Sequence, residues 1–124
     1  MMRLNELQKN IELKKTYLSL GLDTDIEKVP AHLNKYSDSV FEFNKSLIDR
    51  LHNKIIAVKI NTAFYEANGT EGWSSLTKTV DYINHNYPDL FTIADAKRAD
   101  IGNTSSMYAK AFFEKLNFDS ITIS

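Results

Sequence analysis

Apolar residues along the chain follow two different spacings, and the alternation between these spacings predicts the order of the elements. Helical spacing, with apolar residues every three or four positions, is found in residues 4–11, 40–51, 73–87 and 107–115. Strand-like segments, either alternating or continuously apolar, are found in residues 18–22, 54–60, 90–96 and 120–124. The chain is therefore predicted to form one helix followed by four strands, with a further helix between each strand and the next.

Strands that alternate with helices of this length are expected to pair in parallel. Each helix carries the chain back to the edge of the sheet at which the next strand begins, in a right-handed crossover. The run at residues 54–60 is almost continuously apolar, as expected for a strand that is buried on both faces. The predicted fold class is therefore α/β with a parallel sheet.

Charged residues end the first three predicted strands, and they are equally spaced along the chain. They are Asp23, Lys59 and Asp95. The carboxyl ends of parallel strands lie at one edge of a sheet, and that edge is where α/β proteins bind ligands. We therefore expect these three side chains to meet at the carboxyl edge.

The segment "DAKRAD" brings two more charges to the same edge. Lys97 lies two residues after Asp95, and side chains two apart on a strand point to the same side. Asp100 lies beyond the strand, in the turn that leads to the next helix. Together with Asp23 and Lys59, these residues predict a cluster of alternating charge.

The order of charges in the cluster favours one kind of chemistry. A lysine flanked by carboxylates stays protonated, because opposite charges nearby favour the charged form. Such an ammonium group can stabilise a developing carbanion and then donate a proton to it, whereas a lysine that forms a Schiff base must be neutral. The sequence thus favours general-acid catalysis over imine formation.

Two other interpretations of the "DAKRAD" segment stay open at this point. It is also consistent with a solvated loop whose charges pair weakly at the surface. Asp95 and Asp100 are hard oxygen ligands that suit a metal ion, although the lysine between them argues against a metal site. Arg98, in the same turn, is expected to face solvent.

Composition narrows the class of protein. The chain has 124 residues, of which 43% are apolar, and this is enough for one globular domain. Fifteen basic and sixteen acidic residues leave a net charge of −1, which suggests neither a nucleic acid nor an anionic membrane as partner. There is no cysteine, so thiol nucleophiles and zinc-thiolate sites are excluded. Neither a membrane span nor a signal peptide is recognisable, and we expect a cytoplasmic protein.

The charged segment also carries a family resemblance. "DAKRADIGNT" resembles the D-x-K-x-x-D-I signature of orotidine 5′-phosphate decarboxylase, and the similarity extends to "LGLD" on the first strand and "VKINTAFYEANG" after the second. It runs from about residue 17 to residue 124. The resemblance implies a (β/α)8 TIM barrel, a homodimer, and a lyase of pyrimidine biosynthesis that converts orotidine monophosphate to uridine monophosphate and CO2 without metal or cofactor.

The resemblance also implies catalytic roles for individual residues. Lys97 matches the lysine that stabilises the vinyl carbanion and protonates it, and Asp95 matches the carboxylate nearest to the departing CO2. Asp100 matches the carboxylate that one subunit contributes to its neighbour's site. Lys59 matches the lysine of the charged network that also reaches the ribose.

Four further residues match positions that bind the substrate. Asp23 matches the carboxylate on a ribose hydroxyl, and Asn61 resembles a contact on the substrate side. Ile101 and Thr104 match contacts made to the site of the neighbouring subunit.

The length of the chain limits what this resemblance covers. A closed barrel needs eight strands and about 250 residues, whereas four strands are predicted here. We therefore expect residues 1–124 to be the amino-terminal half of a barrel decarboxylase domain, without its phosphate-binding residues. Two alternatives remain, namely a metal-dependent phosphosugar decarboxylase or synthase of the same superfamily, and a half-barrel fragment that has no turnover.

Overall fold

The computed structural model describes residues 1–124. Along the chain it contains helices, strands and short 3-10 turns (η1, η2), followed by one π-helical segment (η3). Their bounds are α1 Leu4–Lys14, β1 Ser19–Gly21, η1 Ile26–Lys28, η2 Ala31–Leu33, α2 Ser39–Leu51, β2 Ala57–Asn61, α3 Ala63–Glu66, α4 Gly69–Asn86, β3 Phe91–Asp95, α5 Gly102–Ala109, η3 Lys110–Lys115 and β4 Ser120–Ile121.

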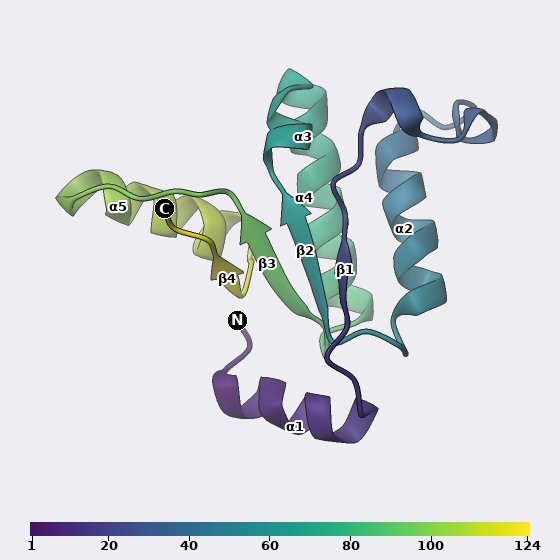
Figure 1. The fold of residues 1–124 in the computed structure, drawn as a ribbon. Helices are drawn as coiled ribbons and strands as arrows, with labels where there is room; N and C mark the ends of the chain where they lie inside the picture. The colour runs from purple at the N-terminus through teal and green to yellow at the C-terminus, as the bar shows by residue number, and fades with distance from the viewer.

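The four strands form one parallel sheet in the order β1-β2-β3-β4, and this confirms the predicted α/β class. Helices α2 and α4 lie on one side of the sheet, and α1 lies below the end at which the strands begin (Figure 1). Helix α5 projects sideways beyond β3 and β4 (Figure 1). Because all four strands are parallel, they begin at one end of the sheet and their carboxyl ends lie together at the opposite end, the carboxyl edge.

The hydrophobic core lies between the sheet and the two helices α2 and α4. Val58 and Ile60 of β2 are fully buried in it, together with Ile48 of α2 and Val80 of α4. Lys59 alternates with the two β2 residues, so it points to the opposite side of the sheet. The strand that was predicted to be buried on both faces therefore carries its charged residue on the face that α2 and α4 do not cover.

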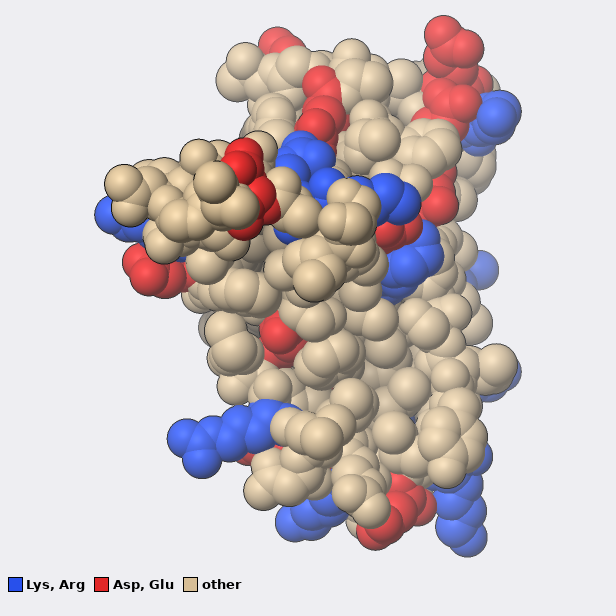
Figure 2. Space-filling model, turned by 60° about the vertical axis from the view of Figure 1, so that its left-hand side comes forward, with Lys and Arg blue, Asp and Glu red and all other residues tan.

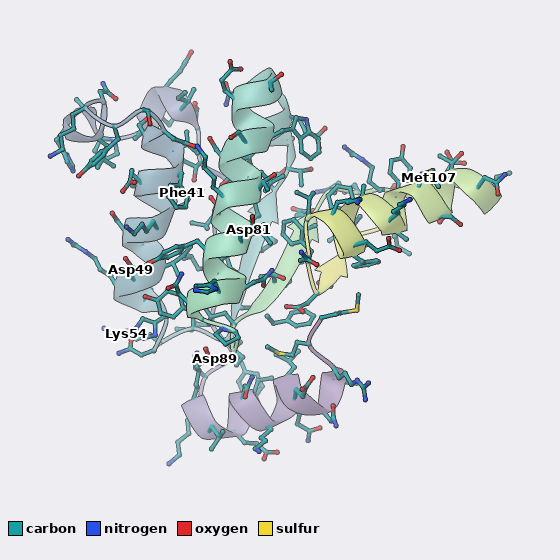
Figure 3. The ribbon with its side chains drawn as sticks, turned by 180° about the vertical axis from the view of Figure 1, so that it is seen from behind. Phe41, Asp49, Lys54, Asp81, Asp89 and Met107 are labelled. Carbon is teal, nitrogen blue, oxygen red and sulfur yellow. The ribbon has the colours of Figure 1, made fainter.

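Asp38 joins the start of α2 to α4. Its Oδ1 accepts hydrogen bonds from the backbone N–H of Phe41 at 2.9 Å and from the hydroxyl of Ser75 at 2.8 Å, and its Oδ2 pairs with Lys78 at 2.9 Å. Burial raises the pKa of this carboxyl, but the hydrogen bonds from Lys78, Phe41 and Ser75 outweigh that effect and the net pKa is lowered. From behind, α2 and α4 run side by side, with Phe41 and Asp49 on α2 and Asp81 on α4 (Figure 3).

The segment between β2 and α4 contains a short helix, α3, that the apolar spacing does not predict. Gly72 of α4 packs so closely against it that a Cβ atom at this position would lie 1.8 Å from the carbonyl oxygen of Tyr65. Only glycine fits there, and this explains one glycine of "EANGTEGW". The contact holds α3 at the carboxyl end of β2.

The last quarter of the chain differs from the predicted pattern. The helix expected at residues 107–115 begins earlier, at Gly102, and continues into a π-helical segment from Lys110. None of the residues of α5 is buried, and Met107, on the part of α5 that projects from the body of the molecule (Figure 3), is exposed. The strand expected at residues 120–124 is only two residues long. No helix of the chain is both long enough and apolar enough to cross a membrane.

Candidate active site

The strand register explains how the charged residues reach one another. Asn61 lies opposite Asp95, whereas Lys59 lies opposite Gly21 and Ile93. Lys59 therefore lies two residues before the level of Asp95 in the sheet, although the sequence intervals between the charged residues are equal. Its long side chain makes up the difference, because it extends along the strand direction toward the edge.

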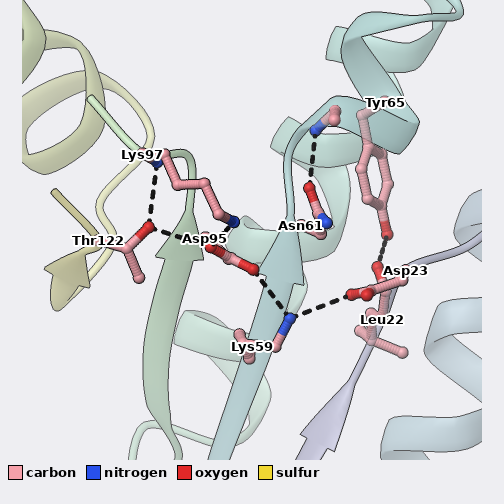
Figure 4. A network of polar contacts seen from close by, with 9 residues as sticks. Leu22, Asp23, Lys59, Asn61, Tyr65, Asp95, Lys97 and Thr122 are labelled. Atoms are coloured by element: carbon pink, nitrogen blue, oxygen red, sulfur yellow. Dashed lines mark hydrogen bonds and ion pairs between the residues drawn. The ribbon is translucent and has the colours of Figure 1, made fainter. Parts of the chain in front are cut away.

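Four of the residues singled out from the sequence are in direct contact. The Nζ atom of Lys59 lies 3.1 Å from Asp95 Oδ2 and 3.4 Å from Asp23 Oδ1. The Nζ atom of Lys97 lies 2.5 Å from Asp95 Oδ1. The four side chains thus form a row of alternating charge across β1, β2 and the end of β3 (Figure 4). We call Asp23, Lys59, Asp95 and Lys97 the charged row.

Asp95 is the centre of the charged row and its least exposed member. Its side chain is 14% exposed, compared with 60% for Lys97. Hydrogen bonds from Lys97 and then Lys59 lower the pKa of Asp95 to about 2, and a bond from Thr122 contributes in the same direction. Partial burial lowers the pKa of Lys59, but Asp95 and Asp23 outweigh this and the net pKa is raised. Asp95 and Lys59 are therefore both charged at neutral pH.

The position of Lys97 depends on an unusual backbone conformation. Its φ angle is +49°, in the left-handed region. This conformation costs a residue other than glycine about 1–2 kcal/mol, so the surrounding structure must hold it in place. The backbone N–H of Lys97 donates to Thr122 Oγ1 at 3.0 Å, and the same hydroxyl donates to Asp95 Oδ1 at 3.0 Å. Thr122 was not singled out from the sequence, because a lone threonine near a strand end carries no recognisable signal.

Arg98 does not face solvent as predicted. One of its guanidinium nitrogens lies 2.7 Å from Glu66 Oε1, and another donates to the carbonyl of Ala96 at 2.6 Å. The guanidinium also lies 5.8 Å from the ring centre of Tyr108. The prediction was wrong because Glu66 is 32 residues away in the sequence, and only the packing of α3 beside the end of β3 brings the two together.

Asp100 was expected in the cluster of alternating charge, and within this chain it is not there. It makes no ion pair, and its Oδ1 accepts from the backbone N–H of Ile101 at 2.7 Å. Ile101 is 87% exposed, and Thr104 is exposed on the projecting helix α5. These three residues lie away from the charged row, because the turn after Lys97 leads outward into the projecting helix α5.

Asn61 ends β2 next to the charged row, and Asp23, which belongs to the row, lies two residues after the end of β1. The side-chain oxygen of Asn61 accepts from the backbone N–H of Ala63 at 3.2 Å, and this bond bends the chain from β2 into α3. The carbonyl of Leu22 accepts from the hydroxyl of Tyr65 at 3.0 Å, which fixes the backbone just before Asp23 (Figure 4). Burial raises the pKa of Tyr65 to about 12, so its hydroxyl keeps the proton it donates.

Lysine and arginine side chains lie next to aspartate and glutamate side chains in the upper part of the space-filling view (Figure 2). Most of the surface below them in that view is neither acidic nor basic (Figure 2). No group of three or more histidine, cysteine or acidic side chains lies close enough together to hold a metal ion. What the charged row offers chemically is an ammonium group, Lys97, beside a carboxylate that stays ionised.

We predict that Asp95 titrates near pH 2 and that both neighbouring lysines are responsible. Its pKa is lowered from 3.8 to about 2 in the folded chain, so its contribution to stability is complete above pH 3.8 and is lost as the pH falls toward 2. Carbon-13 NMR of the Asp95 carboxyl should show this midpoint. Lys97→Ala and Lys59→Ala should each raise it.

Lys78→Ala is the matched control for this titration, because Lys78 pairs with Asp38 and not with the charged row. It should leave the Asp95 midpoint unchanged. A midpoint near 4 in the unsubstituted chain would show that the charged row does not form in solution.

Comparisons with known proteins agree on one family. The family model of the orotidine 5′-phosphate decarboxylase / HUMPS family matches residues 16–124. The orotidine 5′-phosphate decarboxylase of Flavobacterium johnsoniae is 61% identical over 122 residues, which are 98% of this chain and 45% of the relative. That of Christiangramia forsetii is 58% identical over 118 residues, which are 95% of this chain and 43% of the relative. The chain spans about half the length of the curated relatives it matches.

Solved structures show the same correspondence. A crystal structure from Toxoplasma gondii, titled as an orotidine-monophosphate decarboxylase, matches with a TM-score of 0.85 and 30% identity, covering 96% of this chain and 40% of that one. The structure of Leishmania donovani OMP decarboxylase matches with a TM-score of 0.79 and 31% identity, covering 99% of this chain and 44% of that one. The fold is thus that of a partial barrel.

Proposed function

Because the chain belongs to the orotidine 5′-phosphate decarboxylase / HUMPS family, we propose that it is the amino-terminal half of a decarboxylase domain that converts orotidine monophosphate to uridine monophosphate and CO2. The observation that carries this proposal is the contact of Lys97 with Asp95 at the carboxyl edge of the sheet. The reaction belongs to pyrimidine biosynthesis, and we propose that it takes place in the cytoplasm without metal or cofactor.

In the proposed mechanism each member of the charged row has a separate task. The substrate carboxylate lies beside Asp95, which stays ionised and so disfavours a second negative charge next to it. As the bond from C6 to the carboxyl carbon breaks, its electron pair stays on C6 and CO2 leaves. The ammonium group of Lys97 stabilises that charge and then transfers a proton to C6. Lys59 holds Asp95 in place from the other side.

Asp23 and Asn61 are proposed to bind the substrate. Asp23 Oδ1 is 3.4 Å from Lys59 and its side chain is 41% exposed, so it can still accept a hydrogen bond from a ribose hydroxyl. Asn61 lies opposite Asp95 in the sheet, and its amide nitrogen can donate to the substrate while its oxygen holds Ala63. Both lie on the same edge as the proposed proton donor.

The proposal can be tested in a full-length chain, meaning residues 1–124 joined to the carboxyl-terminal part of the Flavobacterium johnsoniae relative. Loss of the absorbance of orotidine monophosphate should be observed, and EDTA should not slow it. Activity on orotidine monophosphate that EDTA abolishes would contradict the metal-free mechanism. Magnesium-dependent turnover of a phosphosugar alone would favour the other candidate function, a metal-dependent phosphosugar decarboxylase or synthase of the same superfamily.

We further propose that the full-length chain acts as a homodimer in which Asp100, Ile101 and Thr104 reach the neighbouring site. Two observations support this. The three residues are exposed and lie away from their own charged row, at the start of the projecting helix α5. Met107 on the same helix is 60% exposed, so α5 presents apolar surface that a second subunit can cover.

A mixing experiment tests this arrangement. Full-length Lys97→Ala and Asp100→Ala chains should each be inactive, and a 1:1 mixture should recover about a quarter of the normal activity. The reason is that half of the dimers are mixed, and each mixed dimer has one site with neither substitution. A mixture of Lys97→Ala with Asp95→Ala chains is the control and should stay inactive, because both residues belong to the same subunit's site. No recovery after confirmed subunit exchange would contradict the shared site.

A further inference from the structure

Thr122 follows β4, and its hydroxyl lies between two parts of the charged row (Figure 4). It accepts from the backbone N–H of Lys97 at 3.0 Å and donates to Asp95 Oδ1 at 3.0 Å. The ammonium group of Lys97 contacts the same carboxylate oxygen at 2.5 Å. One oxygen atom of Thr122 therefore couples the backbone of Lys97 to the carboxylate that its side chain contacts.

The Thr122 hydroxyl acts both as a hydrogen-bond donor and as an acceptor. A threonine hydroxyl has one proton to donate, and Asp95 takes it because an ionised carboxylate only accepts. The oxygen is then free to accept from Lys97. Valine has the same shape but can do neither, whereas serine can do both.

The backbone of Thr122 makes two further hydrogen bonds to residues 94–98, the segment that contains Lys97. Its N–H donates to the carbonyl of Ala94 at 2.9 Å, and its carbonyl accepts from the N–H of Arg98 at 3.1 Å. These contacts lie on either side of Lys97, the residue whose φ angle is +49°. Thr122 thus contacts the segment before, at and after the point where the chain adopts the left-handed conformation.

We propose that Thr122 is a positioning residue that sets the place of Lys97 relative to Asp95. The proposal rests on the proposed function in so far as Lys97 is the proton donor. Thr122 does not touch the reacting atoms. It keeps the left-handed turn in place, so that the ammonium group of Lys97 lies where the charge of the reaction develops.

The test compares Thr122→Val with Thr122→Ser in the full-length chain. Thr122→Val should lower kcat about tenfold to a hundredfold, because small displacements of a catalytic group have effects of this size. KM should change by less than about threefold, since the substrate contacts of other residues are retained. Thr122→Ser should keep kcat within about threefold of the unsubstituted chain, because it keeps both hydrogen bonds.

Amide hydrogen exchange of Lys97, followed by NMR, gives a second readout that does not need turnover. Thr122→Val should speed exchange at this amide by about tenfold or more, whereas Thr122→Ser should not. Thr77→Val is the matched control, because its hydroxyl only bonds the carbonyl of Trp73 within α4. It should change neither kcat nor the exchange rate at Lys97. If the valine variant does not fold, Thr122→Ala compared with Thr122→Ser isolates the hydroxyl in the same way.

The outcomes separate this proposal from the proposed function. If the unsubstituted full-length chain has no turnover, the proposed function is wrong, and exchange at Lys97 still decides the role of Thr122. Unchanged kcat together with unchanged exchange in Thr122→Val would overturn the proposal. Equal losses in Thr122→Ser and Thr122→Val would also overturn it, because the effect would then come from packing and not from the hydroxyl.

Discussion

Replacing Lys97 with alanine in the full-length chain is expected to lower kcat by about a thousandfold or more, since a positioned proton donor alone contributes factors of this order. In the proposed mechanism the ammonium group interacts with the charge on C6 only as that charge develops, so its loss would raise the barrier to reaction. Binding of uridine monophosphate, measured by calorimetry, should weaken by less than about tenfold, because an interaction made in the transition state contributes little to the ground state.

Lys54→Ala is the control for this variant. Lys54 lies before β2, at the end of the sheet where the strands begin, and its side chain makes no ion pair (Figure 3). Its replacement should leave kcat unchanged. The Lys97 side chain is 60% exposed, so its removal should not unfold the protein, and circular dichroism can check this. Retention of more than about a tenth of the normal kcat by Lys97→Ala would show that another group donates the proton.

The 124-residue chain by itself is expected to have no measurable decarboxylase activity. It holds the charged row, but Lys97 is 60% exposed and Asp23 is 41% exposed, so water reaches both groups. Water weakens charge interactions by raising the local dielectric constant. Barrel enzymes of this kind commonly bind phosphate after strands seven and eight, and the energy of that binding organises the reacting centre and so affects kcat as well as KM.

Supplying the carboxyl-terminal part of the Flavobacterium johnsoniae relative as a separate chain should restore some activity. The face of the sheet opposite α2 and α4 is uncovered (Figure 1). The outer strands β1 and β4 each have one side with unpaired backbone groups, which favours association with further strands. The added part alone, and the added part mixed with a Lys97→Ala form of this chain, are the controls and should be inactive. Turnover by the 124-residue chain alone at a rate near that of the full-length chain would contradict the prediction.

Several features of the fold could be predicted because they depend on local spacing. The order of strands and helices follows from apolar periodicity, and the parallel pairing follows from that order. Asp23, Lys59 and Asp95 could be assigned to one edge because strand ends coincide in a parallel sheet. The contacts of Lys59 with both carboxylates agree with this assignment.

Other features could not be predicted, because they depend on contacts between distant segments. Arg98 was expected in solvent, but α3 brings Glu66 within 2.7 Å of it. Asp100 was expected in the charged cluster, but the turn into α5 carries it outward. Helix α5 has no buried residue, so apolar spacing, which reports burial within one chain, could not define where it begins.

The sequence by itself determined that Asp23, Lys59, Asp95 and Lys97 meet at the carboxyl edge, because residue type and strand periodicity are local properties of the chain. Only the tertiary structure decided how these groups are held. Strand register placed Lys59 two residues below the level of the carboxylates, and the return of the chain through β4 placed Thr122 against Asp95 and against the left-handed backbone of Lys97. Such contacts join residues 25 and 27 positions apart, and their geometry depends on the packing of whole elements, which no local pattern specifies.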